Sequence, residues 1–553
     1  MSNHLFSQIP RAQIQRSSFN RSHTYKTALD ENYLIPFYCD EVLPGDTFNL
    51  KYNLFGRLAT PAVPVLDNMY LDTFFFFVPS RLVWDNWQRF NGEQKNPGDS
   101  TDYLIPTVSC DGTSGSIYDY FGIPYLEGNG ASAGTTIDVN ALPFRAYNLI
   151  YNEWFRDENL INSVSVPTGD GPDSASNYRL LKRGKRHDYF TSALPWPQKG
   201  PGVEIPLGTT AGVTMTDAHP PVVYGSLYST SSGAFMNATY RGKHVGVAVG
   251  DSQSDVFREQ SNVTPYVSTS STGISTLPYA SSYAPLYTDL SKAGLSVDLS
   301  QATAATINSL RQAFQLQRLY ERDARGGSRY TEILRSHFGV VSPDARLQRP
   351  EYLGGGSTRI QVNPVAQTSA TDQVTPQGNL AAFGLVADRR NGFKKSFVEH
   401  GFIIGLCNLR ADLNYQQGLN RMWSRQTRFD FYWPVLAHLG EQAILSKEIF
   451  ADGSAADDDV FGYQERYAEY RYKPNMITGK LRSTDPNSLD VWHLAQKFTN
   501  RPVLNKEFIE ENVPLSRSIA IQNEPHLLLD VFFELSCVRP MPVYGVPGLV
   551  DHF

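Results

Sequence analysis

The stretch MYLDTFFFFV, from Met69 to Val78, carries apolar and aromatic side chains on both faces of an extended chain. A strand with one face in water alternates apolar and polar residues, so the apolar character of both faces predicts a strand buried between two layers. Pro79 ends this strand, and Ser80 is suited to cap a short amphipathic helix that runs to about Phe90.

A different pattern precedes this buried strand. Between Asp46 and Leu54 the apolar residues Phe48, Leu50, Tyr52 and Leu54 alternate with polar ones, which predicts a strand with one buried face. Strand patterns return after Gly392, in FKKSFVEHGFIIGLCNLR (393–410), RFDFYWPVL (428–436), ERYAEYRYKP (465–474) and HLLLDVFFELSCVRP (526–540). One sheet system is therefore expected to draw strands from both ends of the chain, as in a Greek-key sandwich or barrel with long insertions.

The middle of the chain differs in composition. Apolar residues at helical spacing predict helices from about Ala141 to Asn159 and from about Gln301 to Arg325. Between them, Gly225–Ala284 is dominated by Ser, Thr, Gly, Ala and Tyr and buries little aliphatic surface. We expect long loops or a projecting insertion there, with disorder as the alternative.

The totals agree with a β-rich folded protein. The 553 residues carry a net charge of −6 and include 42 glycines and 34 prolines, which favours short elements and irregular loops. The four cysteines, Cys39, Cys110, Cys407 and Cys537, are far apart and are expected to be reduced. No apolar run approaches the ~20 residues of a membrane helix, and the N-terminus lacks a signal-peptide core, so we expect a soluble chain made in a cytosol.

Motifs of catalysis are missing from the sequence. It contains no G-x-x-x-x-G-K-[ST] loop, no H-E-x-x-H helix and no G-x-S-x-G elbow. The glycines at 128, 130 and 134 favour a flexible loop over a dinucleotide site, and Asp457–Asp459 favours a solvated loop over a calcium site. We therefore predict no enzyme activity, no cofactor and no metal site.

Two basic regions predict binding to single-stranded nucleic acid, because cations neutralise phosphates and aromatic rings stack on unpaired bases. The first is the basic stretch 182–187, whose DNA-facing candidates are Lys182, Arg183, Lys185 and Arg186. The base-stacking candidates Tyr178, Tyr189 and Phe190 flank it. The second is an N-terminal arm without Asp or Glu, whose candidates are Arg11, Arg16, Arg21 and Lys26. The alternatives are a solvated or inter-subunit charged loop and an ordinary frayed terminus.

Four stretches carry a resemblance to a known family. They are FFFFVPSRLVWDNW (74–87), HDYFTSALPWPQKGP (187–201), SHFGVVSPDARLQRPEYLGGG (336–356) and YGVPGL (544–549). Together they resemble the major capsid proteins of gokushoviruses, small single-stranded DNA phages of the Microviridae, over nearly the whole chain. The resemblance implies a structural protein: a single eight-stranded antiparallel viral jelly roll, mainly β, with long insertions containing several helices, in a T = 1 icosahedral shell around single-stranded DNA.

The resemblance also implies a division of the chain. We expect a basic arm (1–27), jelly-roll strands with insertions (28–224), a variable surface insertion (225–284), a helical and loop region (285–391) and C-terminal jelly-roll strands with a tail (392–553). The variable insertion would form a three-fold protrusion used in host attachment, with Tyr228, Tyr240, Tyr266 and Tyr279 as candidate contacts.

The partners implied are further copies of the chain, packaged single-stranded DNA, a small basic DNA-binding virion protein, a minor pilot-type virion protein and a host cell-surface receptor. The location implied is the virion, assembled in the host bacterial cytoplasm. The competing hypothesis is a secreted β-sandwich that binds carbohydrate or acts as a glycosidase, motivated by the many Tyr and Trp residues. It expects a secretion signal, which the sequence lacks.

Overall fold

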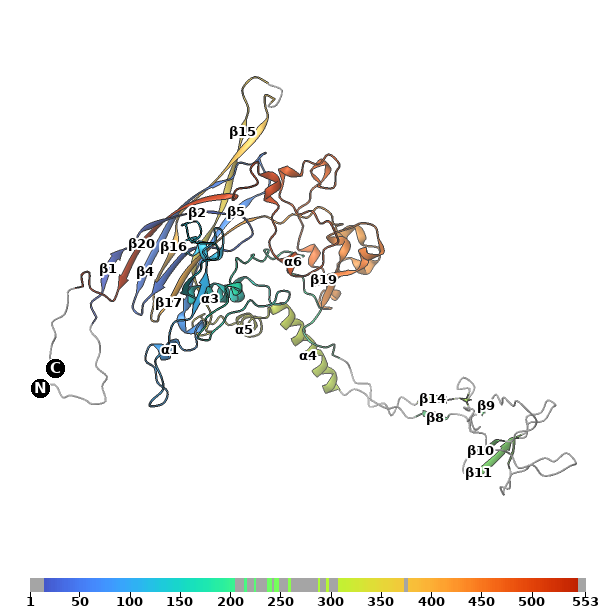
Figure 1. The fold of residues 1–553 in the computed structure, drawn as a ribbon. Coiled ribbons are helices and arrows are strands. Elements are labelled where there is room, and N and C mark those ends of the chain that lie inside the picture. The colour runs from blue at the N-terminus through green and yellow to red at the C-terminus, as the bar shows by residue number, and fades with distance from the viewer. Residues whose placement is uncertain are drawn as a thin grey trace. The chain divides into compact units, whose positions relative to one another are not determined.

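The structure, a computed structural model, describes residues 14–203, 307–371 and 376–545, together with the backbone of short strands between 213 and 297. Contacts divide the chain into one unit of residues 1–202 and 317–553 and a second unit of residues 203–316. The first unit contains the main sheet (Figure 1). In the described parts, no helix is both long and apolar enough to cross a membrane.

The main sheet has nine antiparallel strands in the order β1-β20-β4-β16-β15-β5-β17-β3, and β2 also pairs with β20. Their bounds are β1 Ser17–Asn20, β2 His23–Leu29, β3 Ile35–Val42, β4 Thr47–Leu58, β5 Met69–Pro79, β15 Glu351–Ala366, β16 Leu380–Ser396, β17 Gly401–Ala411 and β20 Leu527–Arg539. The prediction that the fold is mainly β, with sheet strands drawn from both ends of the chain, is confirmed. However, β15 and most of β16 lie within 285–391, where a helical and loop region was expected.

The strand pairs of this sheet are nested. Strand β5 pairs with β15, β4 with β16, β3 with β17, and β2 with β20. Four strands from the first 80 residues thus meet four strands from the last 203 in reverse order. Further antiparallel pairs, β20 with β4, β17 with β5 and β15 with β16, join these four ladders into one sheet.

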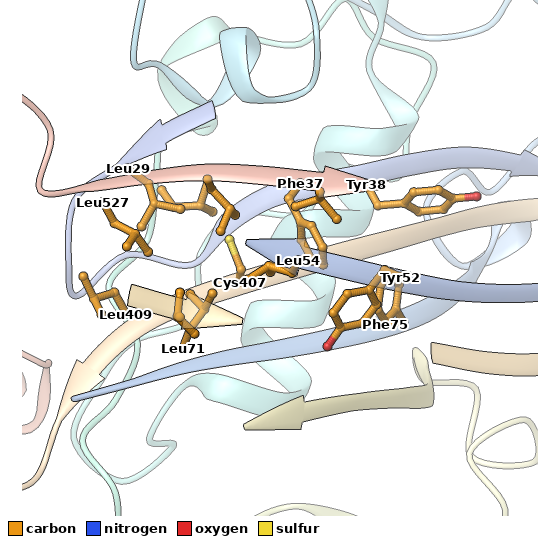
Figure 2. Packing of buried hydrophobic residues seen from close by; sticks show 14 of the residues in the cluster. Leu29, Phe37, Tyr38, Tyr52, Leu54, Leu71, Phe75, Cys407, Leu409 and Leu527 are labelled. Atoms are coloured by element: carbon orange, nitrogen blue, oxygen red, sulfur yellow. The ribbon is translucent and has the colours of Figure 1, made fainter. Parts of the chain in front are cut away.

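The sheet curls so that its two ends approach each other. Phe37 and Tyr38 lie on β3, the last strand in the order, and their rings are 5.6 and 5.0 Å from the ring of Phe533 on β20. The enclosed side chains form the main core, in which Leu29 lies near Leu527 and Phe37 lies near Leu54 (Figure 2). Strands β4 and β20 alternate buried and exposed residues, as the period of two predicts.

Strands β5 and β17 are buried on both faces. Phe75 and Phe77 point into the main core, while Phe76 and Val78 belong to a second cluster with Trp84 and residues of α3. The α3 helix spans Leu142–Ile150 and continues as a π-helical turn, η2, over Tyr151–Phe155. The predicted position of the aromatic strand between two layers is therefore confirmed, and the helix predicted from about Ala141 is confirmed in a shorter form.

The remaining elements of the first unit are short. Besides several 3-10 turns, they include α1 Trp87–Phe90, α2 Ile117–Tyr120, α5 Tyr330–Phe338, α6 Lys506–Ile509, the hairpin of β6 Thr107–Cys110 and β7 Ile137–Asn140, and the hairpin of β18 Glu441–Leu445 and β19 Val460–Glu465. The helix predicted to end at Arg325 is α4, Ile307–Gly326, which crosses the boundary between the units. All four cysteines are free thiols, as expected.

Within the second unit the described backbone forms antiparallel pairs of short strands. They are β8 Val213–Met215 with β14 Leu295–Val297, β9 Val223–Tyr224 with β13 Tyr287–Thr288, and the sheet of β10 Met236–Tyr240, β11 Lys243–Val247 and β12 Phe257–Glu259. Some strand pairing therefore occurs in and around the Ser- and Thr-rich stretch, where disorder was the alternative.

Two strand predictions are wrong. Residues 428–436 form the 3-10 turns η6 (Arg428–Asp430) and η7 (Pro434–Leu436). The carboxylate of Asp430 accepts hydrogen bonds from the backbone of Gln426 and Thr427, which bends the chain, and Pro434 has no N–H to donate to a ladder. The stretch from 465 to 474 leaves β19 at once for the 3-10 turn η10, Ala468–Tyr470.

One buried carboxylate connects several segments of the first unit. Asp72, on β5, accepts hydrogen bonds from Arg410 Nε of β17 (2.7 Å), Arg183 Nη1 (2.6 Å) and Ser357 Oγ of β15. Although burial opposes the charged form, these hydrogen bonds hold the pKa of Asp72 below its ordinary value. Glu511 lies in the same region, since its backbone N–H donates to the carbonyl of Arg183 at 2.8 Å.

Replacing this carboxylate should destabilise the fold strongly. We expect Asp72→Ala to lower the free energy of unfolding by about 3–5 kcal/mol, because the guanidinium of Arg410, 2% exposed, loses its buried counter-charge. Chemical denaturation of the purified chain measures this. The matched control is Asp530→Ala, whose exposed pair with Lys26 should contribute less than about 1 kcal/mol. Equal losses in both variants would contradict the role given to Asp72.

Stability should also fall as the pH rises through the titration of Glu511. Burial raises the pKa of Glu511 to about 7, against the opposing pull of Arg183. Between the ordinary value of 4.5 and about 7 the folded chain keeps a proton that the unfolded chain releases, so stability decreases across that interval. Glu511→Gln should remove the loss of stability that the titration of Glu511 causes. Glu524→Gln, at an exposed position, is the control and should leave that loss unchanged. Melting temperatures at pH 5, 6, 7 and 8 measure it, and parallel pH profiles for wild type and Glu511→Gln would refute it.

Candidate functional site

A cavity of about 450 Å³ lies where β5, the η2 turn and the basic stretch 182–187 meet. Its lining combines rings with cations. The residues that line it are Phe74, Phe76, Trp154, Phe155, Arg156, Asp157, Arg183, Gly184, Lys185, Arg186, His187, Thr191, Arg329, Glu332, Tyr352 and Ile509. Five of them are Arg or Lys and two are carboxylates, so the cavity is basic in a chain that is acidic as a whole.

The rings of this cavity come from the alternation of β5. Because successive side chains of a strand point to opposite faces, Phe74 and Phe76 share the face away from the main core. Phe74 packs edge-on against Phe155 at 5.2 Å, and Phe76 lies 5.4 Å from Trp154. Tyr352 of β15, 42% exposed, lies 5.5 Å from Phe76 and widens the aromatic wall.

Two of the cations are structural. Arg183 pairs with Asp72 and lies over the ring of Phe74 at 5.1 Å. Lys185 is 5% exposed and donates to Gln496 Oε1 at 2.7 Å and to the carbonyl of Phe508 at 2.6 Å. Burial lowers the pKa of Lys185 to about 8. Arg183 and Lys185 therefore hold the segment in place and have little charge to offer a ligand.

Two basic side chains at the cavity remain available. Arg186 and His187 are exposed, and in the described parts of the chain no hydrogen bond or ion pair holds either side chain. The backbone before them is fixed, since Lys185 N–H donates to the carbonyl of Ile509 at 2.8 Å. The cavity thus presents one guanidinium and one imidazole from an ordered support.

The other cations of the lining are compensated. Arg329 pairs with Glu158 at 3.2 Å and with Glu332 at 3.3 Å, and it donates to the backbone carbonyls of Asn152 and Arg156. Arg156 donates to the carbonyl of Ile161 and lies 3.4 Å from Glu158. These contacts tie α5 to the η2 turn and shape the wall of the cavity.

The arrangement is suited to a planar aromatic group that carries a negative charge. Rings offer stacking surfaces, and Arg186 with His187 can donate hydrogen bonds to an anion such as phosphate. Among the described residues, the cavity brings together no acid, base and nucleophile in a catalytic arrangement.

The three predicted base-stacking rings lie elsewhere. Tyr178 is 4% exposed and packs with Phe144, Tyr189 is 7% exposed and donates to Glu448 at 3.0 Å, and Phe190 is 2% exposed. In this fold their faces are covered by the core, so they have no surface to offer a base. Lys182 lies over the ring of Tyr33 at 5.7 Å.

The predicted basic arm is part of the sheet from Ser17 onward, where β1 and β2 pair with β20. Arg16 donates to the carbonyl of Gly45 at 2.7 Å, Arg21 forms a two-bond pair with Asp40, and Lys26 lies 3.6 Å from Asp530. Their charges are thus partly used within the chain. Arg11 lies outside the described residues.

The candidate host contacts cannot be placed as side chains. Tyr228, Tyr266 and Tyr279 lie outside the described residues. Tyr240 ends strand β10, of which the backbone alone is described.

One group of described residues could hold a metal ion. Ligand atoms of Asp30, Glu31 and His526 lie within 4.8 Å of one another where β2 ends and β20 begins. Glu31 Oε2 is 2.5 Å from His526 Nδ1, and this hydrogen bond raises the pKa of His526. Both carboxylates contact His526, so these three residues already have polar partners without a metal ion. We interpret the cluster as an ion pair that joins the end of β2 to the start of β20.

Sequence reasoning found the basic stretch and missed the rings that face it. Phe74 and Phe76 were recognised as strand residues, but their partners Trp154 and Tyr352 come from segments nearly 80 and 280 positions away. The usable signal was the period of two in the Phe74–Phe77 run, which places two rings on the face opposite the core.

Comparisons with known proteins agree over the whole chain. A family model described as "Capsid protein (F protein)" matches residues 7–549. The chain is 50% identical to capsid protein VP1 of Bdellovibrio phage phiMH2K, covering 100% of this chain and 98% of that protein. It is 45% identical to capsid protein VP1 of Chlamydia phage 1 (98% and 97% covered) and 35% identical to that of Spiroplasma virus 4 (99% and 97% covered).

Proposed function

The chain belongs to the phage capsid (F protein) family, and from this premise we propose that it is the major capsid protein of a Microviridae phage and assembles into a T = 1 icosahedral shell around single-stranded DNA. Membership in a capsid family indicates a structural protein of the virion that associates with its own kind. It replaces the hypothesis of a secreted carbohydrate-binding protein or glycosidase.

The observation that carries the proposal is the nested strand pairing. A jelly roll is a long antiparallel hairpin of four strand pairs, wound so that two Greek keys close over one core. Strands β2, β3, β4 and β5 with β20, β17, β16 and β15 give these four pairs. We therefore interpret the curled sheet as a single viral jelly roll whose insertions supply contacts between subunits.

The cavity supports a role toward packaged DNA. Its rings and the two unpaired basic groups suit an unpaired nucleotide, because a single strand offers a base to stack and a phosphate to neutralise. The remaining partners of the proposal are a small basic DNA-binding virion protein, a pilot-type protein and a host receptor. We place assembly in the host bacterial cytoplasm and attachment on the insertion 225–284.

Electron microscopy of the chain produced in bacteria tests the shell. We expect closed particles of uniform size from the full chain, and also from a variant in which a short Gly/Ser linker replaces 225–284, because the main sheet lies outside that range.

If 225–284 attaches the phage to its host, virions with the linker should lose adsorption to host cells. Shells that form without adsorption support both parts of the proposal. A full chain that never forms closed particles would refute the shell, and linker virions that adsorb normally would refute the attachment role.

Replacing Arg186 and His187, the two available basic residues of the cavity, should weaken binding to single-stranded DNA. We expect Arg186→Gln with His187→Gln to lower the affinity for an unstructured oligonucleotide several-fold and to reduce the salt dependence by about one ion, as loss of a phosphate contact does. Fluorescence anisotropy at several salt concentrations measures both quantities. Lys95→Gln is the control, since Lys95 is exposed and does not belong to the cavity lining. The DNA-facing assignment is wrong if the double variant binds as the wild type does.

A further inference from the structure

The segment between β17 and β18 exposes an unusual number of large apolar side chains. We call residues 421–439 the aromatic segment. Its exposed members include Trp423 (70%), Phe429 (58%), Phe431 (50%), Tyr432 (50%) and Val435 (81%). Monomeric soluble proteins rarely leave such a cluster uncovered, so the segment has the character of a contact surface.

The aromatic segment is held in place by hydrogen bonds within it and by contacts with Tyr467 and Tyr470. The indole N–H of Trp433 donates to the carbonyl of Arg428 at 2.8 Å, and the backbone N–H of Tyr432 donates to Tyr470 Oη at 3.3 Å. The ring of Tyr432 also packs edge-on against Tyr467 at 5.2 Å. A surface ordered in advance loses little conformational entropy on binding, which favours tight association.

The charges of the segment distinguish a protein partner from a nucleic acid. Arg421 lies 2.8 Å from Glu448, and Arg425 lies 3.2 Å from Glu469. Arg428 stacks over neighbouring rings of its own segment. Two of the three arginines are thus neutralised within the chain, whereas nucleic-acid binding depends on cations free to replace counterions. Compensated arginines among Trp, Tyr and Phe are the composition of a protein–protein interface centre.

We propose that the aromatic segment is a contact surface for a second copy of this chain. The inference rests on the proposed function, because a capsid protein meets its own copies at every edge of the subunit. In an isolated chain the rings of the aromatic segment are in contact with water. A neighbouring copy would bury them, and the burial of this apolar surface stabilises the contact between the two copies.

Two polar substitutions in the aromatic segment, one of them charged, test the surface. We expect Val435→Asp to reduce the assembled fraction of the full chain at least tenfold, because a carboxylate would have to be buried in the contact. Trp423→Ser, which removes a ring that is 70% exposed, should reduce it in the same direction. Val398→Asp is the matched control, since Val398 is 88% exposed and outside the segment. Sedimentation velocity and electron microscopy give the assembled fraction, and a melting temperature within a few degrees of wild type verifies folding.

The outcomes separate this inference from the proposed function. If Val435→Asp and Trp423→Ser form shells as abundantly as the wild type does, the inference is overturned and the proposed function stands. The same holds if the control Val398→Asp loses as much of its assembled fraction as the two segment variants do. Normal assembly with weakened oligonucleotide binding in the two segment variants would assign the surface to nucleic acid instead. If the wild type forms no shell, the proposed function fails. In that case a photoreactive benzoylphenylalanine in place of Phe431 decides: cross-links between chains support the surface, and their absence at high concentration overturns it.

Discussion

The carboxylate of Asp72 is the interaction on which the arrangement of the first unit depends. It is the one charged group in a strand that is mostly apolar and aromatic, and it binds Arg410 from β17, Arg183 from the basic stretch and Ser357 from β15. A buried carboxylate without these donors would be too costly to desolvate, and the two arginines without it would be equally costly. The sheet and the basic stretch are therefore ordered together.

This dependence explains why an acidic chain contains the sequence KRGKRH. Its charges have divided roles: Arg183 and Lys185 are inside, paired or hydrogen-bonded, and Arg186 with His187 reach the rim of the cavity. The same division applies to the Phe run, in which alternate rings enter the core and the cavity wall. One strand with two apolar faces thus builds both the core and the candidate site.

Local patterns in the sequence predicted local structure well, and distant contacts poorly. The alternation around Phe48–Leu54 and the two apolar faces of Met69–Val78 correspond to observed strands, because periodicity reports how one segment is buried. The rings near residue 185 were assigned to a nucleic-acid surface because they are close in sequence. Tyr189 and Phe190 instead turn into a separate core, where contacts with residues near 415 and 461 decide their position. The strand predicted at 428–436 failed because Asp430 hydrogen bonds and Pro434 outweighed its β-forming composition.

The nesting of the strands also orders events during synthesis on the ribosome. Strand β5 meets its partner β15 first, about 280 residues later, and β4 then meets β16, whereas β2 waits for β20, which begins at Leu527. Long-range pairing of this kind is slow, and strand edges stay open until it is complete. A chain that stops before Leu527 lacks the strand that joins β1, β2 and β4, so it cannot complete the sheet. Because β20 follows all of its partner strands in the sequence, the sheet can close only after β20 has been synthesised.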